Sequence, residues 1–205
     1  MPGPRAATVW PRHAKIAFIG SHGIRKTSAL LAFAAEAQRA GLSVELGREV
    51  VRDNPLGINE SATGEAQLWV LVSQIRQELV LAPKADVLAT DRGVMDNFAY
   101  YLRSASGVDE FAVEPLIRRW SQTYDLVVRL LPDVALQADG VRSTNDAFRD
   151  EVEAILDRVL PELVPAGRMV TLRASEATSR YDWFAVLARL AEAIGGTVLA
   201  PDLWR

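Results

Sequence analysis

The chain has 205 residues, enough for one domain with a substantial core, and 49% of them are hydrophobic. Its formal net charge of −3 argues against general nucleic-acid binding, which requires a basic surface. The absence of cysteine excludes disulfides, thiolate metal sites and cysteine nucleophiles, and two histidines are too few for a histidine-rich metal site.

The first fourteen residues do not resemble a signal peptide. Residues 1–14 contain three prolines and two arginines, and they lack the apolar run of a signal peptide. No uncharged stretch approaches the roughly 18 apolar residues of a membrane span. We therefore expect a cytoplasmic protein without membrane contact, in which a flexible segment, 1–14, precedes a single domain, 15–205.

Strand and helix patterns alternate along this domain. In chain order they predict strand 15–19, helix 26–40, strand 43–46, helix 64–81, strand 86–90, helices 94–103 and 110–123, strand 126–131, helix 146–160, strand 168–172 and helix 179–194. On helix 64–81 an apolar stripe is expected to face the core; it comprises Leu68, Leu71, Val72, Ile75 and Leu79. The alternation predicts an α/β fold, with a doubly wound parallel sheet covered by helices on both faces.

The first strand runs into the loop Gly20-Ser21-His22-Gly23-Ile24-Arg25-Lys26-Thr27. Three of the four fixed positions of the P-loop pattern G-x-x-x-x-G-K-[ST] are filled, by Gly20, Lys26 and Thr27. Backbone N–H groups and the helix dipole make such a loop an anion site. We expect Lys26 to reach the β- and γ-phosphates of ATP and Thr27 to coordinate Mg²⁺. The rest of the nucleotide site is expected to comprise Gly20, Ser21, His22, Gly23, Ile24, Arg25 and Ser28, with His22 a neutral lining residue.

Arg25 departs from this pattern, because it stands where the glycine before the lysine belongs. A residue with a side chain in the left-handed conformation costs roughly 1–2 kcal/mol. The guanidinium offers partial compensation, since it pairs well with phosphate. Two alternatives stay open beside a working P-loop: a plain strand-to-helix turn and a weakened nucleotide site. We predict that Arg25→Gly binds nucleotide more tightly.

A second constellation follows the strand at 86–90. In P-loop proteins an aspartate in the place of Asp91 binds the Mg²⁺ shell or acts as a base. Ligands gather beyond the carboxyl ends of parallel strands, so Asp91 should face Lys26. Arg92 suits an anionic substrate or the transferred phosphoryl group. The alternative for this pair is a helix cap with a surface ion pair, and Asp96 is either a substrate contact or a cap.

The phosphate loop, the segment Asp91-Arg92-Gly93-Val94-Met95-Asp96-Asn97 and a later arginine-bearing segment resemble the P-loop kinase group. That group includes nucleoside and nucleotide kinases and the nicotinamide riboside kinase-like proteins often labelled AAA-family ATPases. The resemblance spans most of residues 15–195 and implies a three-layer P-loop NTPase fold with a five-stranded parallel sheet in the order 2-3-1-4-5. It also implies ATP–Mg²⁺-dependent transfer to a small acceptor. In thymidylate kinase-like members an Asp-Arg pair occupies the place of Asp91-Arg92.

Kinases of this group close an arginine-bearing lid over the phosphates. The segment at about 139–150 suits this role, with Arg142 contacting nucleotide and transferred charge and Arg149 contacting nucleotide. Ordinary surface arginines are the alternative. On the acceptor side, Glu49 and Arg52 follow the second strand and are the expected substrate contacts, together with Asp96.

These features favour a kinase whose partners are a nucleotide and a nucleoside- or nucleotide-like small molecule. Two other functions stay open: a nucleotide-binding ATPase or switch, and a non-catalytic P-loop protein weakened by Arg25. The acceptor, the choice between ATP and GTP, and a homodimer are not determined by these residues.

Overall fold

The computed structural model describes residues 8–57, 59–105, 108–136, 145–177 and 181–198. Within them one parallel sheet has five strands in the order β2-β3-β1-β4-β5. The strands are β1 (Ala14–Ile19), β2 (Val44–Gly47), β3 (Val87–Asp91), β4 (Leu126–Leu131) and β5 (Met169–Arg173). The predicted fold class and strand order are confirmed.

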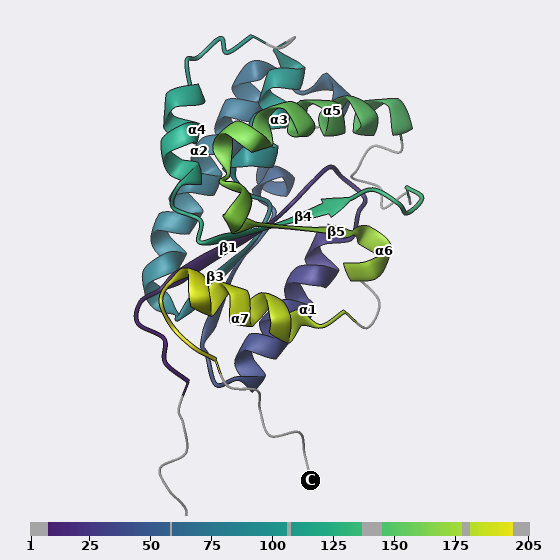
Figure 1. Ribbon diagram of the computed structural model, residues 1–205. Coiled ribbons are helices and arrows are strands. Elements are labelled where there is room, and N and C mark those ends of the chain that lie inside the picture. Colours follow the sequence, from purple (N-terminus) through teal and green to yellow (C-terminus); the bar gives the residue numbers. More distant parts are fainter. Residues whose placement is uncertain (1–7, 58, 106–107, 137–144, 178–180, 199–205) are drawn as a thin grey trace, which may run out of the picture.

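Helices cover both faces of this sheet (Figure 1). On one face lie α1 (Lys26–Arg39), α6 (Ala174–Ala177) and α7 (Trp183–Ala193). On the other lie α2 (Gly64–Leu81), α3 (Val94–Ser104), α4 (Glu114–Ser121) and α5 (Asp146–Leu163). Short 3₁₀ turns occupy η1 (Val50–Asp53), η2 (Asn59–Ser61), η3 (Ala82–Lys84) and η4 (Ala166–Arg168). No helix among the described residues is apolar over enough of its length to cross a membrane.

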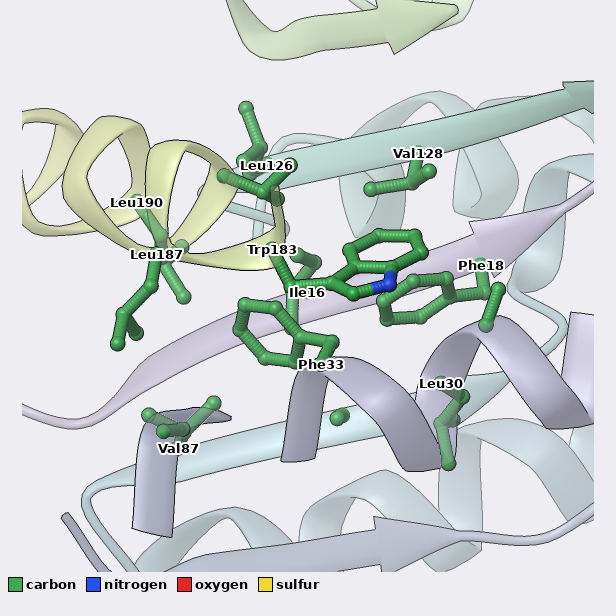
Figure 2. Close-up of a cluster of buried hydrophobic side chains, with 14 of the residues drawn as sticks. Ile16, Phe18, Leu30, Phe33, Val87, Leu126, Val128, Trp183, Leu187 and Leu190 are labelled. Carbon is green, nitrogen blue, oxygen red and sulfur yellow. The ribbon is translucent and has the colours of Figure 1, made fainter. Parts of the chain in front are cut away.

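All six residues of β1 are buried, and they alternate between two cores. Ile16 and Phe18 face α1 and α7, because successive side chains of a strand point to opposite sides of the sheet. There the Phe18 ring centroid lies 5.7 Å from those of both Phe33 and Trp183 (Figure 2). Ala17 and Ile19 join the core under α3 and α5. The central strand therefore fixes the phosphate loop between two packed layers.

The buried face of α2 is more polar than the sequence indicates. Leu71 is buried, but Val72 and Leu79 of the predicted stripe are 54% and 63% exposed, so the stripe was wrong in part. The buried face instead includes Glu78, whose carboxylate accepts from Lys15 Nζ at 2.7 Å and from Trp120 Nε1 at 2.8 Å. Lys15 is buried on β1, and a buried ammonium requires a charged partner. That requirement sets the rotation of α2.

Two helices begin later than predicted. Helix α4 begins at Glu114 instead of 110, because the Asp109 carboxylate accepts from the N–H groups of Val113 and Glu114 at 2.8 Å and terminates the preceding turn. The predicted helix at 179–194 begins only at Trp183, where the Asp182 carboxylate accepts from the N–H of Ala185 at 3.3 Å. The short helix α6 was not predicted.

The described part of the N-terminal segment contacts the domain. Val9 forms an isolated antiparallel bridge with Thr197, and Trp10 Nε1 donates to the Asp86 carbonyl at 2.9 Å. Arg12 pairs with Asp125 at 2.5 Å. These contacts lie at the amino ends of the strands, away from the phosphate loop.

Candidate nucleotide site

The phosphate loop, residues 20–27, leaves the carboxyl end of β1 beside the end of β3, where Phe18 pairs with Asp91. Gly20 has φ of 136°, and a Cβ at this position would lie 2.6 Å from the Leu130 carbonyl oxygen. Gly23 has φ of 73°, and a Cβ there would lie 2.4 Å from Leu136 Cδ2. Both angles strain a residue with a side chain. At Gly20 a side chain would also meet backbone, whereas at Gly23 it would have to displace the Leu136 side chain.

Arg25 occupies the third left-handed position of the loop, with φ 59° and ψ 34° immediately before α1. Arg25 therefore adopts the left-handed conformation that suits the glycine expected at this position of the motif. The residue is exposed, as is Ser28 in the first turn of α1. The strain falls on the backbone of Arg25, since its side chain reaches solvent.

Lys26 is buried, and its ammonium turns back onto the loop. Nζ donates to the Gly20 carbonyl at 3.1 Å and to the Ser21 carbonyl. Burial, followed by the charge of Arg92, lowers the pKa of Lys26 to about 8. The ammonium is thus held by two neutral acceptors that anionic oxygens would outcompete.

Thr27 and Asp91, the predicted metal ligands, are in direct contact. The Thr27 hydroxyl donates to Asp91 Oδ2. Asp91 Oδ1 is buried and has no hydrogen-bond partner among the described residues. The structure therefore brings Lys26, Thr27 and Asp91 together at one edge of the sheet, with an orphaned carboxylate oxygen facing no described donor.

Arg92 is buried at φ 82°, which excludes the surface ion pair considered for this segment. Its Nε donates to Glu49 Oε1 at 2.8 Å, and its guanidinium lies 4.8 Å above the Tyr100 ring. A longer contact of 3.5 Å joins it to Asp96 Oδ2. Two carboxylates and an aromatic face therefore hold the guanidinium in place.

Asp96 both caps a helix and belongs to this charged cluster. Its Oδ1 accepts from the N–H of Gly93 at 2.8 Å, at the start of α3, while Oδ2 faces Arg92. Burial raises the pKa of Asp96 to about 6, against the opposing charges of Arg92 and Lys26. The structure therefore shows the helix cap, and the alternative contact of Asp96 with substrate stays a prediction.

Two of the three predicted acceptor residues line a cavity of about 350 Å³ beside Asp91. Glu49 and Arg52 reach it from the segment after β2, and Arg52 Nε pairs with Glu49 Oε2 at 3.2 Å. The cavity is lined by Thr27, Leu30, Leu31, Leu46, Gly47, Arg48, Glu49, Arg52, Asp53 and Asp91. Asp96 is not among these residues. The predicted metal ligands and two predicted acceptor contacts thus share one cavity.

His22 packs inside the loop against two aromatic rings. It stacks on Phe148 with ring centroids 5.1 Å apart, and its Nδ1 lies 3.1 Å from the Tyr100 hydroxyl. Burial, then the charges of Arg92 and Lys26, lowers the pKa of His22 to about 4. The imidazole is therefore neutral at pH 7.

The predicted lid lies only partly within the described residues. Arg142 and residues 137–144 lie outside them. Arg149 lies on α5, where its guanidinium donates to the Val134 carbonyl at 3.1 Å and pairs with Asp146 at 2.8 Å. Contact of either arginine with nucleotide stays a prediction.

Several side chains at the loop were missed by sequence reasoning. Glu153 Oε1 accepts from the N–H of Ser21 at 2.9 Å, although the two residues are 132 positions apart. Tyr100 and Phe148 hold His22, and Gln74 Nε2 donates to the Arg92 carbonyl at 3.4 Å. One signal was available: Glu153 interrupts the apolar face of its helix, beside the buried Val152 and Leu156.

Comparison with known proteins adds the family and the fold. A family model described as an AAA domain matches residues 15–171. None of the curated proteins compared matches the chain. A solved structure of NadR protein in complex with NR superposes with TM-score 0.66 at 17% identity, covering 91% of this chain and 53% of the other. NadR protein in complex with NAD and AMP-PNP gives 0.62 at 16%, covering 89% and 50%.

Thymidylate kinase from Ehrlichia chaffeensis gives TM-score 0.58 at 15% identity, covering 86% of this chain and 98% of the other. The chain therefore spans about half the length of the two NadR chains and nearly the whole of the thymidylate kinase. At these identities the likeness shows a shared kinase-like P-loop fold. The resemblance inferred from the two short motifs is confirmed at that level.

Proposed function

The chain belongs to the AAA domain family, and from that premise we propose that it binds Mg-ATP and transfers a phosphoryl group to a small acceptor. The kinase-like P-loop fold supports nucleotide-binding phosphotransfer as a class. The observation that carries the finer proposal is the cavity in which Thr27 and Asp91 meet Glu49 and Arg52.

The nucleotide side of the proposal rests on Lys26. Its ammonium now lies on the carbonyls of Gly20 and Ser21, within the loop whose N–H groups would surround a phosphate. Exchange of these carbonyls for phosphate oxygens replaces neutral acceptors by charged ones, which form stronger hydrogen bonds. In the proposal Arg142 and Arg149 add positive charge from the lid side.

The donor set suits Mg²⁺. One hydroxyl and one carboxylate, Thr27 and Asp91, already touch, and the orphaned Asp91 Oδ1 is an oxygen ligand of the kind this hard cation prefers. The described residues contain no cluster of three or more histidines and carboxylates that would hold a metal without help. Thr27 and Asp91 would therefore hold the ion together with nucleotide phosphates. When bound, it neutralises charge that develops on the transferred phosphoryl group.

Charge in the cavity favours an acceptor that brings hydroxyls rather than a phosphate. Arg52 and Arg92 both pair with Glu49, and Arg48 pairs with Asp53 at 2.6 Å. An acceptor phosphate would have to displace carboxylates from these arginines, whereas a hydroxyl donates to a carboxylate directly. We place a nucleoside-like acceptor ahead of a nucleotide. One of the NadR proteins of similar fold was solved in complex with NR.

For the chemical step, Asp91 is proposed either to hold the Mg²⁺ shell or to act as the base, because a carboxylate bound to the ion has a lowered proton affinity. As the base it takes the acceptor proton, while the acceptor oxygen forms a bond to the γ-phosphorus and the bond from that phosphorus to the β–γ bridging oxygen breaks. In the proposal Lys26 contacts the transferred phosphoryl group, and Arg92, which stays paired with Glu49, adds positive charge nearby. Glu49, with Arg52, orients the acceptor hydroxyls, and Asp96 acts through its contact with Arg92.

Nucleotide binding is tested by calorimetry and thermal shift with Mg-ATP and Mg-GTP. We expect binding and a raised melting temperature for the natural chain, and loss of both in Lys26→Ala. Lys84→Ala is the matched control, because Lys84 is exposed at the opposite end of the sheet, before β3. Unchanged affinity in Lys26→Ala would contradict the assignment of the phosphate loop.

Transfer is tested with labelled ATP and two acceptor panels, nucleosides and nucleoside monophosphates, with Asp91→Asn as the inactive comparison. The proposal predicts labelled product from nucleosides. Preferred labelling of monophosphates would overturn the acceptor assignment, and release of phosphate to water alone would indicate an ATPase or switch. Absence of stabilisation at millimolar Mg-ATP would leave a non-catalytic P-loop protein.

A further inference from the structure

Glu153 lies on α5, which covers the sheet face opposite α1, and its carboxylate contacts the phosphate loop. It is 9% exposed, and its Oε1 accepts from the N–H of Ser21 at 2.9 Å. Its Oε2 accepts from Arg129 Nη2 of β4 at 3.2 Å. A buried carboxylate is costly unless it is paired and hydrogen-bonded, and here both conditions are met at the loop.

The Gly20–Ser21 peptide links Glu153 to Lys26. In a trans peptide the N–H and C=O groups point in opposite directions, so the Ser21 N–H and the Gly20 C=O are fixed by one plane. Glu153 holds the N–H, and the carbonyl on the other side accepts from Lys26 Nζ at 3.1 Å. Gly20 itself has φ of 136°, a backbone conformation that residues with a side chain rarely adopt. Rotation of the peptide would turn an N–H toward the ammonium.

A second contact from the same helix supports this arrangement. The Phe148 ring of α5 stacks on His22, with centroids 5.1 Å apart and planes inclined by 28°. Helix α5 therefore holds two consecutive loop residues, Ser21 by a hydrogen bond and His22 by ring packing. Arg129 balances the charge of Glu153 and pairs also with Asp157 at 2.5 Å.

We propose that Glu153 is a positioning residue of the phosphate loop: its carboxylate fixes the Gly20–Ser21 peptide in the orientation that receives Lys26. Glu153 makes no contact with substrate and acts through the backbone. The consequence for affinity rests on the nucleotide binding proposed above. The consequence for the loop itself, a hydrogen bond from the Ser21 amide to a charged acceptor, does not depend on nucleotide binding.

The experiment compares Glu153→Gln, Glu153→Ala and the control Asp157→Asn in the full chain. Glutamine retains an oxygen that accepts from Ser21 N–H, whereas alanine removes it. Asp157→Asn removes a carboxylate from the same arginine without touching the loop. The readouts are the ¹H–¹⁵N shift and hydrogen exchange of the Ser21 amide without nucleotide, Mg-ATP affinity by calorimetry, and melting temperature.

We expect Glu153→Ala to move the Ser21 amide signal upfield and speed its exchange. It should also weaken Mg-ATP binding about tenfold, because a loop that Glu153 no longer fixes must be ordered when phosphate binds. Glu153→Gln should restore most of the affinity, and Asp157→Asn should match the natural chain. If Glu153→Gln and Glu153→Ala lost equal Mg-ATP affinity, only the ion pair of Glu153 with Arg129 would matter, and the proposal would be overturned. An unchanged Ser21 amide signal in Glu153→Ala would overturn it as well. If the natural chain bound no nucleotide, the proposed function would fail while the amide readouts still decided the role of Glu153.

Discussion

At the scale of single residues, Arg25 shows where the phosphate loop stores strain. Its backbone is left-handed, and its side chain is exposed. The strain of a residue with a side chain in this conformation opposes folding. The guanidinium stands at the amino end of α1, where cations are unfavourable and phosphates are favourable.

We predict that Arg25→Gly raises the free energy of unfolding by about 1 kcal/mol over Arg25→Ala, because both lack the guanidinium and only glycine relaxes the backbone. Chemical denaturation measures the difference. Arg25→Gly should also bind Mg-ATP more tightly than the natural chain, as calorimetry would show. Equal stability of the glycine and alanine variants would exclude backbone strain, and weaker binding by glycine would show that Arg25 assists phosphate.

His22 gives the fold a measurable sensitivity to acid. Its folded pKa of about 4 lies below the unfolded value of 6.5, so the unfolded chain binds the proton first. The contribution of neutral His22 is complete above pH 6.5 and declines as the pH falls toward 4. Relative to His22→Gln, the natural chain should lose about 2 kcal/mol of stability between pH 7 and pH 5.

Urea denaturation of both chains across this pH range tests the prediction. The comparison removes contributions common to both, including that of Asp96, whose raised pKa acts with the opposite sign over a similar interval. If the two stability curves ran parallel across this pH range, the pKa of His22 would not be depressed. The constant offset between them would then reflect only the packing of His22 against Phe148.

Part of this site could be predicted from the sequence, because the residues concerned are placed by patterns in the neighbouring sequence. Lys26 and Thr27 are set by motif spacing, and Asp91 by the end of an apolar strand. Glu153 reaches Ser21 across 132 positions, so its role depends on how α5 packs. Burial also turned Arg92 inward to Glu49, which no local pattern in the chain specifies.

At the scale of elements, the attachment of α7 depends on Trp183. Its ring packs against Phe18 in the cluster beneath β1 (Figure 2), yet its indole Nε1 is buried without a hydrogen-bond partner in the described part of the chain. An unpaired buried donor costs free energy that an apolar ring of similar shape would not. Trp183 therefore combines a large apolar contribution with a polar penalty.

We predict that Trp183→Ala lowers the free energy of unfolding by about 3–4 kcal/mol, because it opens a large cavity. Trp183→Phe removes the unpaired N–H and keeps most of the ring, so it should cost less than about 1 kcal/mol. Thermal and urea unfolding measure both variants. A phenylalanine variant as unstable as alanine would show that the indole donor has a partner in solution.

The elements that sequence predicted best are those with local boundaries. Helix α1 was predicted to within a residue because Gly41 follows it, and α2 was predicted over its full length because Pro83 follows its apolar pattern. The cap that Thr63 provides at the start of α2 is a finding of the structure. The face that α2 buries was predicted less well, since Lys15 of β1 draws Glu78 inward. That pairing depends on the sheet, and the sequence of the helix alone favours the apolar stripe.

At the scale of the whole molecule, two apolar cores enclose a charged site. Lys26, Arg92, Glu49, Asp91 and Asp96 are all buried at the carboxyl edge of the sheet. Burial of charge opposes folding, and mutual pairing offsets this only in part. A bound nucleotide would give Lys26 charged partners. We therefore infer that these buried charges lower the free energy of unfolding of the protein without nucleotide and raise its affinity for nucleotide.

Lys26→Met is the direct test of this inference. Because burial lowers the pKa of Lys26 to about 8, its charged form is disfavoured in the folded chain. The penalty is complete below pH 8 and shrinks as the pH rises toward the unfolded value of 10.5, where both states lose the proton. Methionine removes the charge and keeps the length, at the loss of two hydrogen bonds to loop carbonyls.

Without nucleotide, Lys26→Met should therefore be more stable than the natural chain by about 1 kcal/mol at pH 7, with the difference narrowing above pH 8. Addition of Mg-ATP should reverse the order, since only the natural chain gains stability by binding. Thermal shift with and without Mg-ATP at pH 7 and pH 9 measures both effects. A less stable methionine variant at pH 7 would mean that the carbonyl contacts of Lys26 outweigh its desolvation, and that the loop depends on the ammonium even when empty.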